Sequence, residues 1–267
     1  MKGPTRRVQR LQQSMVRMMV DSVFRDAVYR DQVPELSAED RALLIAPDPR
    51  AWSTDRYRRG RLTRALLDEY PVTGAVVGVS RVDAFFGSDA FAAVLASRGS
   101  ISLAFADWAA PQAGDVALLE GAMCRARRWV PARGKGIQSG PGVVVVDLGA
   151  GTLDFLQHGM ERLGAQSLDA LAQGLRLSRP TVQSAREHVI ITCTADGQVG
   201  ASLVGEAIAA LTRRAARPLS TGALLAAARR LGATPSEAAA LIQDLLNDGV
   251  LAESPPPWPS ALDRALA

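Results

Sequence analysis

The chain has 267 residues, of which 48% are hydrophobic and 22% charged, a composition typical of a globular protein rather than a disordered one. Its net charge of +4 is modest, so we do not expect bulk binding of nucleic acid, and its two cysteines exclude a disulfide framework. No apolar run is long enough to span a membrane, and the basic N-terminal segment lacks the compact apolar block of a secretory signal, so we expect a cytoplasmic protein without membrane contact.

Helical periodicity dominates the N-terminal half. Apolar residues recur at helical spacing, and prolines separate the segments. Ser37, followed by Glu39 and Asp40, is typical of a helix N-cap. The predicted helices are Val8–Arg30, Ser37–Ile45, Trp52–Tyr70 with Pro71 as its stop, one or two across Val82–Leu95, and Asp115–Trp129. We expect them to form a helical domain over residues 1–132.

The segment RGKGIQSGPG, residues 133–142, is rich in glycine. A nucleotide-binding P-loop needs a strand before the glycines and a lysine directly before Ser or Thr. Here the strand follows the glycines instead. We therefore predict a linker between two domains.

The C-terminal half mixes strands with helices. A β-rich segment at 189–194, a turn at 195–197 and a second strand at 198–203 predict a hairpin. The remaining predicted elements are a buried strand Val143–Asp147 and the helices Thr152–Leu163, Ser167–Leu175, Leu203–Arg214, Thr221–Leu231 and Pro235–Asn247. We expect a domain over residues 143–254, a loose proline-rich tail at 255–267, and an α+β fold.

The stretch VVVVDLGAGTLDFLQ, residues 143–157, resembles the phosphate-binding turn of the actin and heat-shock-chaperone class of ATPases. That class holds its nucleotide between two related subdomains, each with such a turn. The sequence contains no second turn of this kind. We interpret Asp147 as a strand end and Thr152 as a helix N-cap, although a small ATPase stays an alternative.

Candidate metal ligands and nucleophiles are few. His158 and His188 are the only histidines, and the spacing of His188 and Cys193 does not suit zinc. Cys193 alternates with Ile191, as in strand packing. We expect no catalytic site and no cofactor in this chain.

The last three helices, following a hairpin, predict a winged-helix-like domain. Its third helix carries Glu237 and Asp244 and no basic residue, so it suits DNA phosphates poorly. Other winged helices bind a peptide that adds as a strand to the hairpin edge. Peptide binding fits better, and a DNA-binding transcription regulator remains the alternative.

Two stretches carry a family resemblance. Residues 189–251, ending in LLNDGVL, are similar to the peptide-recognition element of ribosomal-peptide modification systems. Residues 51–78, AWSTDRYRRGRLTRALLDEYPVTGAVVG, resemble the helical region of partner proteins of multinuclear non-haem iron oxidases, as in methanobactin and 3-thiaglutamate biosynthesis. The resemblance implies a non-catalytic partner in a heterodimer. Iron would sit in the oxidase, and this chain would present a cysteine of a precursor peptide.

The resemblance also implies contact residues. Those for the oxidase or the peptide on the helical domain are Trp52, Asp55, Arg56, Tyr57, Arg58, Arg59, Arg61 and Arg64. Those on the hairpin are Val189, Ile190, Ile191, Thr192, Cys193 and Thr194, where the backbone of an edge strand would bind the peptide. The alternative is that Trp52 and Tyr57 belong to the core and the arginines to a solvated, ion-paired face. Met15, Met18 and Met19 are either a partner interface or core.

Overall fold

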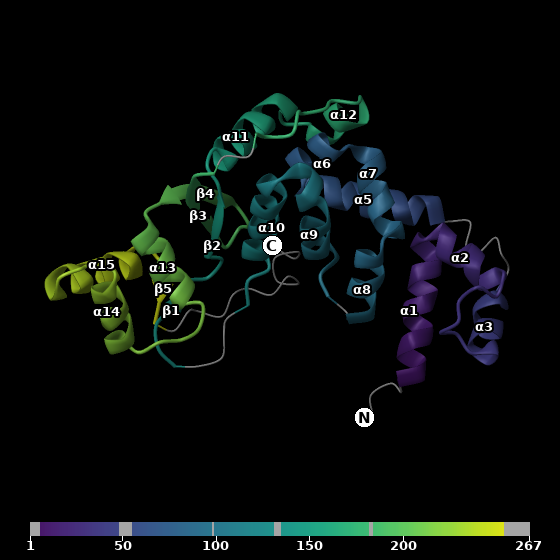
Figure 1. The fold of residues 1–267 in the computed structure, drawn as a ribbon, viewed down its shortest axis with the longest axis horizontal. Coiled ribbons are helices and arrows are strands. Elements are labelled where there is room, and N and C mark those ends of the chain that lie inside the picture. Colours follow the sequence, from purple (N-terminus) through teal and green to yellow (C-terminus); the bar gives the residue numbers. More distant parts are fainter. Residues whose placement is uncertain (1–5, 48–54, 98, 131–134, 182–183, 254–267) are drawn as a thin grey trace. The chain divides into compact units, whose positions relative to one another are not determined.

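The structure is a computed structural model that describes residues 6–47, 55–97, 99–130, 135–181 and 184–253. Its fold is α+β, as predicted: most elements are helices, and the strands form two small antiparallel sheets (Figure 1). In these ranges no helix has both the length and the apolar character needed to cross a membrane. The chain divides into two compact units, Met1–Ala113 with Gly159–Arg179, and Gly114–His158 with Pro180–Ala267.

The first unit is helical throughout its described part. Its helices are α1 (Arg6–Val20), α2 (Ser22–Tyr29), α3 (Ala38–Ile45), α5 (Asp55–Glu69), α6 (Pro71–Val77), α7 (Val79–Ala84), the 3-10 turn η1 (Phe85–Gly87), α8 (Asp89–Ser97), α9 (Ile101–Ala113) and α12 (Ser167–Ala172). The predicted first helix is broken at Asp21, whose carboxylate accepts a hydrogen bond of 2.9 Å from the N–H of Phe24 and so caps α2. Helix α5 ends just before Pro71, as predicted, and Pro71 then begins α6, since a proline fits the first turn.

Aromatic side chains fill the core of the first unit. Phe85 lies at its centre, fully buried, with Phe91 and Phe105 packed edge-on at centroid distances of 5.6 and 5.3 Å. Tyr70 packs edge-on against Phe105 at 5.1 Å, and its hydroxyl donates a hydrogen bond of 2.7 Å to the carbonyl of Ser102. Helix α9, which contains Pro111, was not predicted from the sequence.

The second unit holds both sheets. Its elements are α10 (Asp115–Arg127), β1 (Gln138–Ser139), β2 (Val144–Gly149), β3 (Arg186–Cys193), β4 (Val199–Val204), α13 (Glu206–Arg214), α14 (Thr221–Arg230), α15 (Pro235–Asn247) and β5 (Leu251–Ala252). Helix α11 (Thr152–Leu163) is divided: it belongs to this unit up to His158 and to the first unit from Gly159. The larger sheet has the order β2-β3-β4, and β1 pairs with β5. The predicted hairpin is therefore present as β3 and β4.

The division into units differs from the predicted domains 1–132 and 143–254. Helix α10, which we had assigned to the helical domain, packs on β2 and β3. The reason is its apolar surface: Val116, Leu119 and Ala122 are buried, and such a helix needs a sheet face to cover it. Residues 159–179, assigned to the second domain, belong to the first unit.

The described part of the predicted linker, residues 135–142, is a packed segment. Gln138 and Ser139 form β1, and the N–H of Gly140 donates a hydrogen bond of 2.8 Å to the carbonyl of Val250. A Cβ at Gly140 would overlap the carbonyl oxygen of Gly249. Glycine is thus needed here for close approach of two backbones rather than for flexibility.

The three C-terminal helices share a core with the small sheet. Leu224 of α14, Ile242 and Leu245 of α15 and Leu251 of β5 are buried together. Thr234 caps α15, as predicted, and forms a capping box in which the carboxylate of Glu237 accepts a hydrogen bond of 2.8 Å from the N–H of Thr234. The winged-helix interpretation of this segment stays a prediction.

Candidate functional site

The turn between β2 and α11 was the candidate phosphate site. The hydroxyl of Thr152 donates a hydrogen bond of 2.6 Å to the carbonyl of Gly149, which closes the turn. The N–H groups of Gly151 and Leu153 donate to the two carboxylate oxygens of Glu187, each at 2.9 Å. The N–H groups at this helix start, which a phosphate would need, are therefore occupied by a carboxylate of the chain itself.

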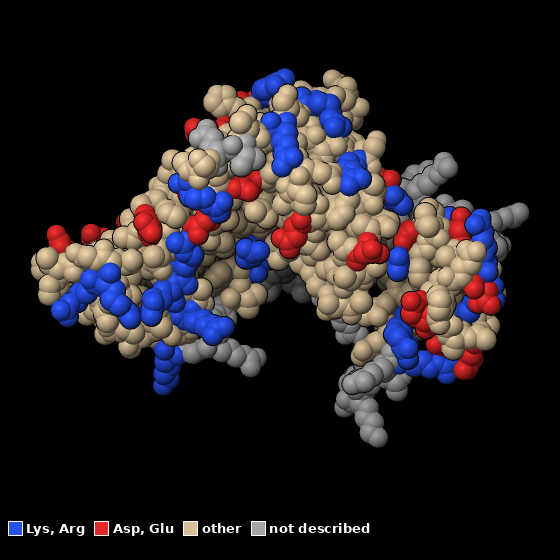
Figure 2. Space-filling model, in the orientation of Figure 1, with Lys and Arg blue, Asp and Glu red and all other residues tan. Residues whose placement is uncertain are grey.

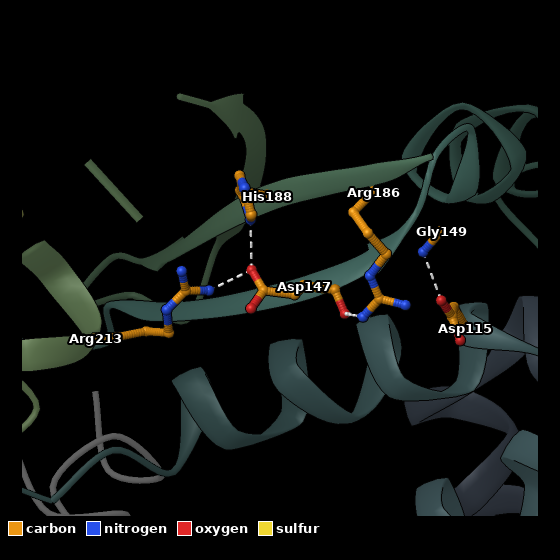
Figure 3. Close-up of polar contacts among 6 residues, drawn as sticks. All are labelled: Asp115, Asp147, Gly149, Arg186, His188 and Arg213. Atoms are coloured by element: carbon orange, nitrogen blue, oxygen red, sulfur yellow. Dashed lines mark hydrogen bonds and ion pairs between the residues drawn. The ribbon is translucent and has the colours of Figure 1, made fainter. Parts of the chain in front are cut away.

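A second carboxylate occupies the other side of the same turn. Asp115, at the start of α10, accepts a hydrogen bond of 2.6 Å from the N–H of Gly149, as Figure 3 shows. The adjoining cavity measures about 190 Å³, and Asp115 lines it. Because two carboxylates face the turn, its electrostatics oppose a nucleotide triphosphate. The turn supports the structural interpretation of VVVVDLGAGTLDFLQ rather than the ATPase alternative.

Asp147 joins three elements of the second unit. Its Oδ1 lies 2.5 Å from Nδ1 of His188 on β3 and also accepts from Arg213 of α13, while Arg186 donates to its carbonyl at 2.9 Å (Figure 3). Burial raises the pKa of Asp147, but the hydrogen bonds from Arg213 and His188 outweigh burial and hold the pKa below its usual value. The ionised carboxylate of Asp147 thus links β2 to β3 and α13.

The structure groups no metal-binding cluster from its described residues. His158 is exposed, and its Nδ1 lies 3.0 Å from the carbonyl of Asp154 in the same helix. Cys193 is a buried residue of β3, as its alternation with Ile191 predicted. The two histidines and Cys193 therefore serve packing and hydrogen bonding in this structure.

The hairpin residues proposed for peptide binding require a correction. Val189, Ile191 and Cys193 do face inward, with exposed fractions of 0, 0 and 4%. However, β3 is the central strand, and its main chain is paired with β2 on one side and β4 on the other. The backbone of residues 189–194 is therefore not available to a further strand, and among the described strands of this sheet β2 and β4 are the edges.

The pairing between β2 and β3 determines which main-chain groups of β2 face its free edge. The N–H of Cys193 donates to the carbonyl of Gly142 at 3.1 Å. Because hydrogen-bonded pairs alternate along an antiparallel ladder, the N–H and C=O groups of Val144 and Val146 also point toward β3. The N–H and C=O of Val145 then point outward. Neither group has a hydrogen-bond partner within the described ranges. An extended chain could form hydrogen bonds with both main-chain groups of Val145. The neighbouring N–H of Val143 and carbonyl of Asp147 on this edge already bond Gly140 and Arg186.

A groove lies along this edge. It has a volume of about 410 Å³ and is lined by three adjacent valines of the β2 edge, by the end of α10 and by the end of α13. The lining residues are Arg125, Arg128, Trp129, Val130, Gln138, Ser139, Val143, Val144, Val145, Thr212, Arg213 and Ala216. An unpaired strand edge with a helix beside it is the arrangement that proteins use to bind a peptide by strand addition.

Sequence reasoning missed this groove. We had described Val143–Asp147 only as a buried strand and Asp115–Trp129 only as a helix. The signal was present in part, because Arg125, Arg128 and Trp129 cluster at one helix end. Their position beside Val145 depends on the packing of α10 on the sheet, which no local pattern shows.

The candidates between residues 52 and 64 fall into three groups. Trp52 lies outside the described residues, as do the side chains of Asp55, Arg56, Tyr57 and Arg58. Arg59 forms an ion pair with Asp83 at 2.5 Å and donates to the carbonyl of Asp83 at 2.7 Å, so it supports the intramolecular alternative.

Arg61 and Arg64 differ from Arg59. They are exposed, three residues apart on one helix face, and within the described ranges no acidic side chain pairs with either. Of the methionines on α1, Met18 is core, and Met15 is 43% exposed.

Arginines also gather on the C-terminal helices. Figure 2 shows basic side chains clustered over α13 and α14. Arg214, Arg217, Arg229 and Arg230 are exposed, and the described part of the chain pairs none of them with an acid. This surface is a second charged feature of the unit.

Neither a protein-family model nor a curated protein matches the chain.

Proposed function

We propose that this protein is a non-catalytic partner protein that binds an extended precursor peptide along β2 and presents it to a separate multinuclear non-haem iron oxidase. The observation that carries the proposal is the outward main chain of Val145 beside the groove. The oxidase follows from the resemblance of residues 51–78 and 189–251. The setting we propose is a cytoplasmic heterodimer.

Strand addition explains how one surface would hold a peptide of little fixed structure. Main-chain hydrogen bonds to Val145 would supply affinity that is independent of the peptide sequence, while the groove would receive alternate side chains. The peptide would be fixed in an extended form, so that a cysteine beyond the bound segment could reach the oxidase. Iron and its ligands belong to the oxidase in this proposal.

The helical unit offers the surface for the oxidase. Arg61 and Arg64 point into solvent without an acidic partner among the described residues, and arginine is enriched at protein interfaces because its planar fork of donors binds carboxylates. The rigid aromatic core around Phe85 would hold these arginines at a fixed spacing. We therefore assign the oxidase contact to the exposed face of α5.

Co-expression tests the proposal. The tagged chain would be produced with the iron oxidase encoded nearest to its gene, purified by affinity and analysed for iron. We expect a one-to-one complex that contains iron only when the oxidase is present. Arg61→Glu combined with Arg64→Glu should abolish co-purification, while Arg162→Glu, a matched change of an exposed arginine on α11, should leave it intact. Purification of the chain alone in every case would contradict the proposal.

A DNA-binding regulator is the second candidate, favoured by the arginines on α13 and α14 (Figure 2). Against it, α15 exposes Glu237 and Asp244 where a recognition helix would meet phosphates. DNA binding through up to four arginines would weaken as the salt concentration rises. The slope of log K against log salt concentration would be no steeper than about 0.9 per phosphate contact, and the affinity would not depend on base sequence. A mobility-shift assay with a random duplex library should therefore select no site; selection of a consensus sequence would favour the regulator.

A further inference from the structure

We propose that the groove selects an acidic peptide segment, with Gln138 holding the peptide main chain and Arg125 binding a carboxylate side chain. This inference rests on the proposed function, because it names the class of peptide that the edge of β2 accepts.

Gln138 provides the first observation. It is 5% exposed, its main chain pairs with Ala252 of β5, and its side chain lines the groove. No hydrogen bond to its side-chain amide is formed within the described ranges. The amide is not one of the fully buried polar groups that lack a partner, so its atoms reach the groove, where they can form hydrogen bonds with a ligand. Its neighbour Ser139, in contrast, donates a hydrogen bond of 3.0 Å to the carbonyl of Thr212.

The amide of Gln138 matches a peptide group. It carries one carbonyl acceptor and an NH₂ donor, so it can accept from the N–H and donate to the C=O of a single extended residue. Such a contact holds a main chain without reading its sequence. It lies in the same groove as the outward N–H and C=O of Val145, which bind main chain in the same way.

The charge of the groove provides the second observation. Among the described residues, the charged ones that line it are Arg125, Arg128 and Arg213, and none of these lining residues is acidic. Asp147 already holds Arg213. Arg125 is exposed and has no ion pair with a described residue. A carboxylate on the bound strand would therefore meet Arg125, whose planar fork binds carboxylates in a bidentate manner.

Fluorescence anisotropy tests the inference with defined probes on the full chain. The probe is a fluorescein-labelled strand-forming peptide of alternating threonine and valine with two central glutamates, and the matched peptides carry glutamine or lysine there. We expect the glutamate peptide to bind about tenfold more tightly than the glutamine peptide, because charge-assisted hydrogen bonds are the stronger ones. The difference should shrink when salt rises from about 0.05 M to about 0.5 M.

Three variants separate the contributions. Arg125→Gln should remove the preference for glutamate and leave the affinity for the glutamine peptide unchanged. Gln138→Leu, similar in volume, should weaken the binding of all three peptides by the same factor while the melting temperature stays the same, since the amide forms no hydrogen bond with another described residue. Arg229→Gln, the loss of an exposed arginine outside the groove, should change nothing.

Each contrary result would overturn a different part of the two proposals. Equal binding of the three peptides, or an Arg125→Gln variant that keeps the preference, would overturn the acidic-segment inference while strand addition stands. Unchanged binding by Gln138→Leu would overturn the role of Gln138. Absence of binding by any peptide, even at the highest soluble concentration, would remove the peptide groove and with it both proposals.

Discussion

Glu187 accepts a hydrogen bond of 2.9 Å from the main-chain N–H of Gly151, at the turn between β2 and α11. The same carboxylate also takes the N–H of Leu153, so one side chain from β3 occupies the helix start. In phosphate-binding turns these N–H groups face the ligand. The chain therefore carries the sequence of such a turn and fills it internally.

Nucleotide should leave the stability of the protein unchanged. The carboxylates of Glu187 and Asp115 occupy the N–H groups and repel phosphate. A ligand at about one hundred times its Kd stabilises a protein by about 2.7 kcal/mol, which a thermal melt detects. We expect no rise in melting temperature with ATP and magnesium. A dose-dependent rise would restore the ATPase interpretation.

Asp147 should make a pH-dependent contribution to stability. Its pKa in the folded chain lies below its value in the unfolded chain, so the ionised carboxylate stabilises the fold above the unfolded pKa, and this contribution is lost as the pH falls through the folded pKa. Asp147→Asn should cost no more than about 1 kcal/mol at neutral pH, because the side chain is 38% exposed.

Denaturant titrations of the wild-type and Asp147→Asn proteins, compared pH by pH, test this contribution. We expect a constant difference in the free energy of unfolding from neutral pH down to about pH 4, and convergence of the two proteins below it. A difference that persists in strong acid would show that the ion pair with Arg213 and the hydrogen bond with His188 are not its cause.

Gly140 should tolerate no side chain, unlike a glycine of a flexible linker. Gly140→Ala places a Cβ against the carbonyl oxygen of Gly249 and should lower the free energy of unfolding by about 1–3 kcal/mol. Gly222→Ala on α14, where nothing lies within 4 Å of the new Cβ, should instead be neutral or stabilise by up to about 1 kcal/mol. Equal stability of the two variants would support the linker that the sequence predicted.

Local sequence patterns predicted the elements better than their assembly. Capping by Ser37 and Thr234, the hairpin turn at 195–197 and the burial of Val189, Ile191 and Cys193 were all correct, because short-range hydrogen bonds and side-chain alternation determine them. The break at Asp21 was missed because apolar periodicity continues through it.

The edge position of β2 could not be predicted from local patterns. Which strand is central depends on pairing between β2 and β3, whose residues are about forty positions apart, for example Asp147 and His188. The units differ from the predicted domains for the same reason, since α10 packs on strands that follow it in the chain. Glycines in the segment 133–142 indicated flexibility, whereas Gly140 serves a close backbone contact.

Strand addition at β2 is the central claim, and a pair of proline variants tests it most directly. Val145 on β2 and Ala201 on β4 both point their N–H outward, and proline is tolerated at such edge positions. Each variant removes one outward donor and obstructs one edge. Leu203, 57% exposed, makes β4 the competing edge.

The measurement is the amount of precursor peptide retained when the tagged chain is co-purified with the oxidase. We expect Val145→Pro to lose the peptide while keeping the oxidase, and Ala201→Pro to keep both. Retention of the peptide by Val145→Pro, with its loss from Ala201→Pro, would contradict the account and assign the peptide to β4.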